Sequence, residues 1–127
     1  MKILIVEDSP LVQKMYGLVF SRREHEMDTA LNGRDALDMI DGPGTPYDLI
    51  LLDLRMPDMD GVAFIDALRH RGPPADSIPI ILTTGESDDS PLVQQARVRG
   101  VSAIVHKPWK PHELREQIRH VVPEQIG

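Results

Sequence analysis

One aliphatic run that ends in a carboxylate constrains the fold of this chain more than any other feature. Residues 49–52 read Leu-Ile-Leu-Leu, and Asp53 follows at once. Four consecutive aliphatic residues are typical of a strand that is buried on both faces, as in a parallel sheet covered by helices. Pro57 and Gly61 then require a loop. An Asp at a strand end is usually a loop-capping residue, so further features have to decide whether Asp53 is functional.

Two other strand-like runs end in charged residues. The run that opens the chain ends at Glu7 and Asp8, and a later one is followed by Lys107. If the strands are parallel, all of these ends lie at one edge of the sheet. Two unit charges about 4 Å apart repel by about 4 kcal/mol at an effective dielectric near 20, so an acid cluster favours a bound cation. Oxygen ligands without any cysteine favour Mg2+ over zinc or copper.

Composition limits the classes of protein that this chain can belong to. At 127 residues, we interpret 1–127 as a single domain. With 41% hydrophobic and only 4% aromatic residues, the core is predicted to be aliphatic. The net charge of −6 argues against nonspecific nucleic-acid binding. No stretch has the length of a signal peptide or a membrane span, so we predict a cytoplasmic protein without disulfides.

Strand and helix signals alternate along the chain. Ser9-Pro10, Gly61 and Ser90-Pro91 mark helix starts, and Asn32-Gly33 is interpreted as a strand-to-helix turn because helical spacing follows it. Five β/α units predict one parallel sheet with helices on both faces and right-handed crossovers. The predicted strands are residues 3–6, 27–31, 49–53, 79–84 and 103–105.

Helical spacing of apolar residues predicts which side chains face the core. In the first helix the predicted inward residues are Leu11, Val12, Met15, Leu18 and Val19. In the later helices they are Phe64, Ile65, Leu68, Val93, Ala96, Leu114, Ile118 and Val121.

Several motifs that would indicate other functions are incomplete. Gly42-Pro43-Gly44 precedes a strand and lacks a third glycine, so it is not a dinucleotide-binding fingerprint. The segment 58–61 resembles part of a calcium loop, but Met56 occupies the first acidic position. The histidines are scattered, and no Ser/His/Asp set is evident.

Five polar residues remain, at or just after the ends of four of the five predicted strands: Glu7, Asp8, Asp53, Thr84 and Lys107. Together with Met56-Pro57-Asp58-Met59-Asp60-Gly61 and Lys107-Pro108-Trp109, they make the whole chain similar to the receiver domain of bacterial two-component response regulators. The resemblance implies a flavodoxin-like, doubly wound five-stranded sheet of order 2-1-3-4-5.

The resemblance also implies a phosphoacceptor switch rather than a metabolic enzyme. Asp53 would take a phosphoryl group from a histidine kinase or a phosphotransfer protein. Mg2+ would be held by Asp8, Asp53 and the backbone carbonyl of Arg55, with Glu7 acting largely through a metal-bound water. Lys107 and the hydroxyl of Thr84 would contact the phosphoryl oxygens. The Lys107-Pro108 bond is a candidate cis peptide.

The chain departs from the family pattern at three places. Ile104 stands where the family often has an aromatic residue that rotates on activation, and Gly85 stands where alanine is common. The interval from Thr84 to Lys107 is one residue longer than usual. Thr83 is an alternative to Thr84 as the hydroxyl residue of the site.

Two other functions on similar folds remain as alternatives. A phosphatase with an aspartyl nucleophile would need a second Asp at position 55, where this chain has Arg55. A flavin- or nucleotide-binding module would need an aromatic pair or a phosphate-binding loop. For a receiver domain we expect a monomer or weak homodimer and an output partner that binds the face of the fourth helix, fifth strand and fifth helix. We also expect Arg55 and Glu86 to pair beside the site.

Overall fold

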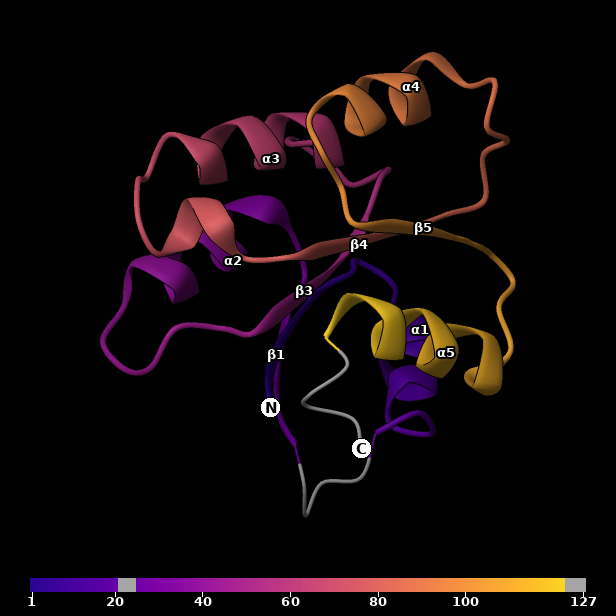
Figure 1. Cartoon of the computed structure of the whole chain (residues 1–127), viewed down its shortest axis with the longest axis horizontal. Helices are drawn as coiled ribbons and strands as arrows, with labels where there is room; N and C mark the ends of the chain where they lie inside the picture. Colours follow the sequence, from indigo (N-terminus) through magenta and orange to yellow (C-terminus); the bar gives the residue numbers. More distant parts are fainter. Residues whose placement is uncertain (21–24, 123–127) are drawn as a thin grey trace.

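The structure, a computed structural model, describes residues 1–20 and 25–122. A five-stranded parallel sheet of order β2-β1-β3-β4-β5 runs through it, as predicted (Figure 1). Each strand lies within one residue of its predicted bounds at either end. The strands are β1 (Lys2–Val6), β2 (Glu26–Ala30), β3 (Leu49–Asp53), β4 (Ile80–Thr84) and β5 (Ala103–His106).

Five α-helices connect and follow the strands. They are α1 (Pro10–Tyr16), α2 (Gly33–Asp41), α3 (Gly61–Arg69), α4 (Pro91–Val98) and α5 (Pro111–Val121), with a short 3-10 helix η1 (Ala75–Ser77) before β4. Side chains satisfy the first free amides of three of them, because Ser9, Asn32 and Asp60 each accept a hydrogen bond from the residue three positions later.

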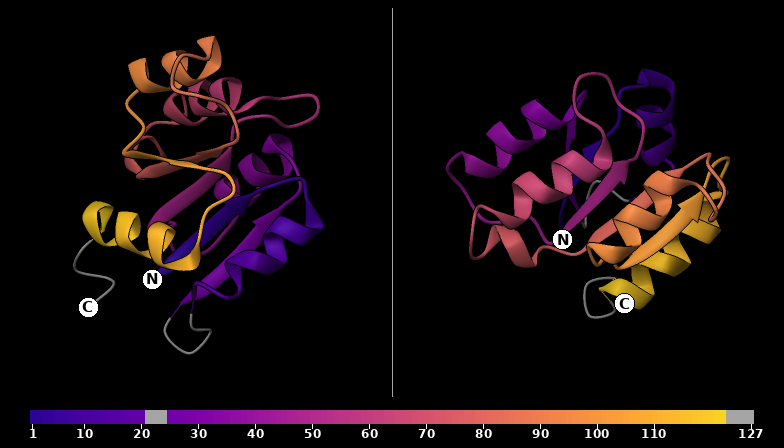
Figure 2. Two further views of the ribbon diagram at one scale, coloured as in Figure 1. Left: turned by 90° about the vertical axis from the view of Figure 1, so that its right-hand side faces the viewer. Right: turned by 90° about the horizontal axis from the view of Figure 1, so that it is seen from above.

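The helices cover both faces of the sheet. Figures 1 and 2 show α1 and α5 on one face and α2, α3 and α4 on the other. The aliphatic residues of β1, β3 and β4 alternate between the two resulting core clusters, which is why their sequences lack a polar face. Because helices cover both faces, polar side chains of the central strands can reach solvent only at the strand ends.

The predicted inward face of α1 and the turn after it is confirmed at Val12, Met15 and Val19 and is wrong at Leu11 and Leu18. Leu11 and Leu18 are 70% and 72% exposed, whereas Tyr16, Val19 and Phe20 are buried. The contact face has the helical spacing 12, 15, 16, 19 and 20, with Val12 and Met15 packed against the same cluster. The two aromatic residues decide the face of the helix, and the aliphatic spacing alone predicted it only in part.

The inward residues of the other helices are largely as predicted. Phe64, Ile65, Leu68, Val93, Ala96, Leu114 and Ile118 are fully buried, and Val121 is half-buried. Helix α4 ends two residues before Gly100, whose φ of 81° lies in the left-handed region that glycine adopts without strain. No helix in the described part of the chain is long and apolar enough to span a bilayer.

Candidate functional site

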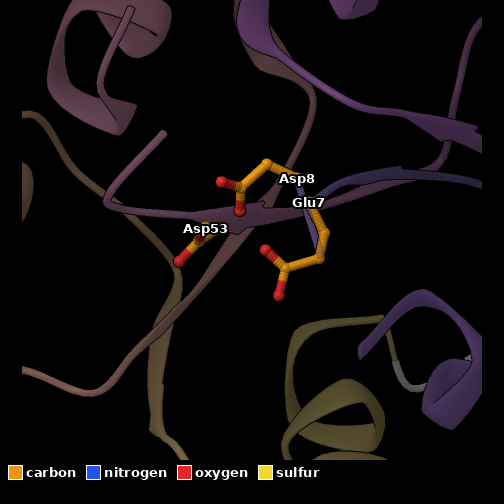
Figure 3. A group of neighbouring side chains, drawn as sticks. All are labelled: Glu7, Asp8 and Asp53. Carbon is orange, nitrogen blue, oxygen red and sulfur yellow. The ribbon is translucent and has the colours of Figure 1, made fainter. Parts of the chain in front are cut away.

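Three carboxylates meet at the carboxyl edge of the sheet. Glu7 and Asp8 follow β1, and Asp53 is the last residue of the neighbouring strand β3. One oxygen from each carboxylate lies within 4.8 Å of the others, and Figure 3 shows the three side chains gathered at the strand ends. Among the described residues, no other three metal-ligating side chains converge in this way. The predicted clustering of acids is therefore present in the structure.

Lys107 reaches into this cluster from the end of β5. Its Nζ donates to Oε1 of Glu7 at 2.7 Å and to Oδ1 of Asp53 at 3.2 Å. Burial lowers the pKa of Lys107, but the hydrogen bond to Glu7 and the charge of Asp53 outweigh it, so that the pKa lies above its usual range. Lys107 is therefore a fixed cation, and three acids against one ammonium leave an excess of negative charge.

Glu7 is the most buried of the three acids, with an exposed fraction of 1%. Burial raises its pKa to about 7, against the lowering effect of the Lys107 hydrogen bond. Its second oxygen, Oε2, is buried and accepts no hydrogen bond from the described residues. An unpartnered buried carboxylate oxygen is costly unless a proton or a cation satisfies it, so the donor set fits a hard cation such as Mg2+.

The two adjacent threonines at the end of β4 have different environments. Thr83 is opposite Asp53 in the strand register, and its hydroxyl accepts from the hydroxyl of Tyr16 at 3.3 Å inside the core. The hydroxyl of Thr84 instead accepts from the amide of Glu86 at 3.0 Å. No hydrogen bond joins Thr84 to the acids in the described part of the chain. The backbone does place it beside Lys107, whose amide donates to the carbonyl of Thr84.

Arg55 and Glu86 pair between the β3–α3 and β4–α4 loops, as the sequence predicted. Nε of Arg55 donates to Oε2 of Glu86 at 2.7 Å, and Nη2 donates to Oε1 at 3.0 Å. The hydroxyl of Ser90 also donates to Oε1, at 2.6 Å. The guanidinium and then the hydroxyl hold the pKa of Glu86 below its usual range. The backbone carbonyl of Arg55 makes no hydrogen bond among the described residues, so it is free to act as a ligand.

Gly61 fixes the shape of the loop that carries Arg55. Its amide donates to the carbonyl of Leu54 at 2.8 Å, and a Cβ at this position would lie 3.1 Å from the carbonyl oxygen of Asp53 and from Cα of Leu54. The start of α3 can approach the end of β3 this closely only because residue 61 lacks a side chain.

Sequence reasoning assigned no individual role to three residues around the site. His106 ends β5 and bonds to the β4–α4 loop, while Tyr16 and Trp109 pack together in the core with ring centroids 5.0 Å apart. The position of His106 directly before Lys107 was a usable signal. The Tyr16 to Thr83 hydrogen bond was not, because it joins residues 67 positions apart. The predicted cis bond between Lys107 and Pro108 is present.

The comparison with known families agrees with this geometry. The model of the response regulator receiver domain matches residues 3–119. The chain belongs to this family. The transcriptional regulatory protein ResD of Bacillus subtilis is 32% identical over 113 residues, which are 89% of this chain and 44% of ResD. This receiver domain spans about half the length of the curated relatives it matches.

Solved structures share the fold along almost the whole chain. The chemotaxis protein CheY4 of Vibrio cholerae is 30% identical with a TM-score of 0.83, and the match covers 95% of this receiver domain and 98% of CheY4. The receiver domain of the sensor histidine kinase PA1611 of Pseudomonas aeruginosa is 24% identical with a TM-score of 0.82, and the match covers 96% and 97% of the two chains. That structure is described with a magnesium ion coordinated in its active-site cleft.

Proposed function

We propose that this receiver domain is a phosphoacceptor switch and that Asp53 takes a phosphoryl group from a histidine kinase or a phosphotransfer protein. The observation that carries the proposal is the convergence of Asp53, two further acids and Lys107 at one edge of the sheet. Asp53 is 6% exposed, so its carboxylate is held in place and water around it is limited. Phosphoryl transfer depends mainly on such positioning and on charge neutralisation.

The residues that would hold Mg2+ are Asp8, Asp53 and the backbone carbonyl of Arg55, with Glu7 contributing through a water. The unpartnered Oε2 of Glu7 and the free carbonyl of Arg55 both fit this role. When bound, the ion would offset the negative charge of the acids and of the incoming phosphoryl group. The magnesium ion of the PA1611 receiver is a precedent on the same fold.

Lys107 and Thr84 would contact the phosphoryl group once it is attached to Asp53. In the present arrangement Lys107 bonds to Oδ1 of Asp53, and phosphorylation would replace this contact with a bond to a phosphoryl oxygen. Thr84 would turn its own hydroxyl hydrogen toward another oxygen. We prefer Thr84 to Thr83 because the hydroxyl of Thr83 lies against Tyr16 in the core, whereas Thr84 is the last residue of β4 and its carbonyl bonds to the amide of Lys107.

The Arg55–Glu86 pair would set the lifetime of the phosphoryl group. The two side chains meet between the β3–α3 and β4–α4 loops, which flank the carboxyl end of β3. A closed pair there would limit the approach of the water that hydrolyses the acyl phosphate. A phosphatase mechanism is less well supported, because position 55 holds a paired guanidinium instead of an acid.

The output would pass through the face formed by α4, β5 and α5. Thr84 and Lys107 lie at the ends of β4 and β5, directly before the loops that lead into α4 and α5. A shift of either residue toward Asp53 would displace these loops. Ile104 is half-buried against the cluster beneath α3 and α4, so we propose aliphatic repacking there in place of an aromatic rotation. The bound output partner would be sensitive to that repacking.

Intact-protein mass spectrometry tests the phosphoacceptor. We expect incubation with acetyl phosphate and Mg2+ to add the mass of one phosphoryl group, and chelation of Mg2+ to abolish the gain. Asp53→Asn should show no gain. Asp48→Asn is the matched control, because Asp48 bonds to the amide of Lys2 at the opposite end of the sheet. A phosphoryl group that persists in Asp53→Asn would disprove the assignment.

A further inference from the structure

His106 joins the end of β5 to the loop between β4 and α4. It is the register partner of Thr84 in the sheet. Nδ1 of its ring lies 3.0 Å from the carbonyl oxygen of Glu86, and Nε2 lies 3.0 Å from Oδ1 of Asp88. Both ring nitrogens therefore face oxygen atoms of the same loop.

Neither of these oxygen atoms can supply a proton. The carbonyl of Glu86 is only an acceptor, and the Arg97 guanidinium together with the His106 ring holds the pKa of Asp88 below its usual range, so Asp88 is a carboxylate. A neutral imidazole has one N–H and can serve one of the two oxygens. An imidazolium has two and serves both. The arrangement of the loop therefore matches the protonated form of His106.

We propose that His106 is a proton-operated latch, in which the imidazolium closes the β4–α4 loop onto β5 and loss of its proton releases the loop, so that switching depends on pH near neutrality. This regulation rests on the proposed function. The His106 side chain is 47% exposed and Asp88 is 59% exposed, so the proton exchanges directly with solvent.

Glu86 couples the latch to the phosphorylation site. Its amide donates to the hydroxyl of Thr84, and its carbonyl is held by His106. A movement of Thr84 toward Asp53 therefore displaces the residue that the imidazolium holds. Acid then favours the present loop arrangement, and phosphorylation is favoured when His106 is neutral. Because coupling is reciprocal, a phosphoryl mimic on Asp53 should lower the affinity of His106 for its proton.

Charged groups on the surrounding elements lie around the ring. From α4, Arg97 binds the same oxygen of Asp88 as His106 does. Lys107 is adjacent in sequence, but its Nζ is directed to the acid cluster. From α5, His112, Glu113 and Glu116 line a crevice with His106. The carboxylate of Asp88 is the charged group that bonds to the ring itself.

NMR without any phosphodonor tests the latch itself. The imidazole ring of His106 and the backbone amides of residues 86–89 are followed from pH 5 to pH 8.5. We expect the amides to shift with the same midpoint as the ring, and this dependence to vanish in His106→Gln. His112→Gln is the matched control, since it removes a histidine from the same crevice without touching the loop. Amides that do not titrate with His106 in the parent would overturn the latch.

Binding of beryllofluoride, a phosphoryl mimic, in saturating Mg2+ tests the coupling. The affinity of His106→Gln is divided by that of the parent at each pH. Both proteins contain the same acid cluster, so its titration does not affect this ratio. We expect His106→Gln to bind about two- to fivefold more tightly than the parent at pH 5.5 and equally at pH 8.5, the range for an exposed ion pair. His112→Gln should follow the parent. The midpoint of His106 should fall when beryllofluoride is bound.

Two results would overturn the coupling and one would overturn the proposed function. A ratio of one at both pH values, or a His106 midpoint unchanged by beryllofluoride, would show that the latch and the site are independent. A parent protein that binds no beryllofluoride at any pH would contradict the phosphoacceptor function. The amide titration measured without phosphodonor would still decide whether the latch exists.

Discussion

At the scale of residues, Glu7 is where burial and charge conflict most directly. The side chain is removed from solvent, one oxygen is bonded to Lys107, and the other has no partner among the described residues. Such a carboxylate is most stable when protonated or when a cation binds it. The carboxylate therefore makes the stability of the metal-free protein depend on pH.

We predict that the metal-free protein loses stability as the pH rises from about 5 to 8. The pKa of Glu7 is about 7 in the fold against 4.5 as its ordinary value, so the folded chain holds a proton that the unfolded chain releases between these values. The proton contributes its full stabilisation below pH 4.5, and this contribution is lost as the pH rises past 7. The free energy of unfolding therefore falls by at most about 3 kcal/mol. Urea unfolding in EDTA at each pH measures the free energy of unfolding of the metal-free protein.

Glu7→Gln is the control for this pH dependence, because its neutral amide resembles the protonated acid. The difference in unfolding free energy between the variant and the parent should grow in favour of the variant from pH 5 to pH 8. Adding Mg2+ should stabilise the parent most at pH 8. Parallel curves for the two proteins would mean that Glu7 does not titrate in this range.

Opening the Arg55–Glu86 pair should shorten the lifetime of the phosphorylated protein. We expect Arg55→Ala and Glu86→Ala each to speed loss of the phosphoryl group by up to about fivefold, the range for an exposed ion pair. The double variant should be no faster than either single one, since all three lack the same pair. Loss of phosphoryl mass after removal of the phosphodonor gives the rates.

Arg71→Ala is the matched control for the lifetime measurement. Arg71 binds Asp41 through the same two-point geometry, at 2.9 Å and 3.0 Å, but it does so beyond the carboxyl end of α3 and at the carboxyl end of α2. The phosphoryl group on Arg71→Ala should have the same lifetime as on the parent protein. Equal lifetimes for Arg55→Ala and the parent would leave the pair as two solvated charges without influence on hydrolysis.

At the scale of elements, the sequence predicted what depends on local pattern. The strands were predictable because their aliphatic runs are bounded by Gly, Pro and charged residues. The starts of α1, α2 and α3 were predictable from Ser9-Pro10, Asn32-Gly33 and Gly61. The clustering of acids followed from strand direction alone. The contact face of α1 and the turn after it was predicted only in part, because Tyr16 and Phe20 are buried while Leu11 and Leu18 are exposed.

A pair of identical substitutions tests this assignment of helix faces. Leu68→Ala removes a fully buried side chain of α3 and should cost about 2–5 kcal/mol of unfolding free energy. Leu18→Ala, just past the end of α1, should change it by less than about 0.5 kcal/mol. Urea unfolding of both variants measures the difference. A large loss for Leu18→Ala would mean that the leucine packs against the core.

At the scale of the whole molecule, the sheet separates two hydrophobic clusters, one on each face. The cluster under α1 and α5 contains Tyr16 and Trp109, and the cluster under α2, α3 and α4 contains Ile104 at its margin. The side chains of the candidate site stand at the strand ends between them. Contacts such as those of His106 with the β4–α4 loop depend on the tertiary arrangement, and the local sequence marks only the place of His106 directly before Lys107.

The output face should respond to a phosphoryl mimic more than the rest of the surface. The β4–α4 loop carries polar residues at 86–90 and is held by side-chain bonds of Ser90, His106 and Arg55 instead of by apolar packing, so it can rearrange at little cost. With beryllofluoride and Mg2+, we expect the largest amide shifts outside the site at residues 85–106 and in α5.

Moving from a mostly inactive to a mostly active population requires about 5.5 kcal/mol for a change from 1:99 to 99:1. Charge-assisted bonds from Lys107 and Thr84 are the proposed source. Shifts concentrated in α2, with residues 85–122 unchanged, would place the output surface elsewhere.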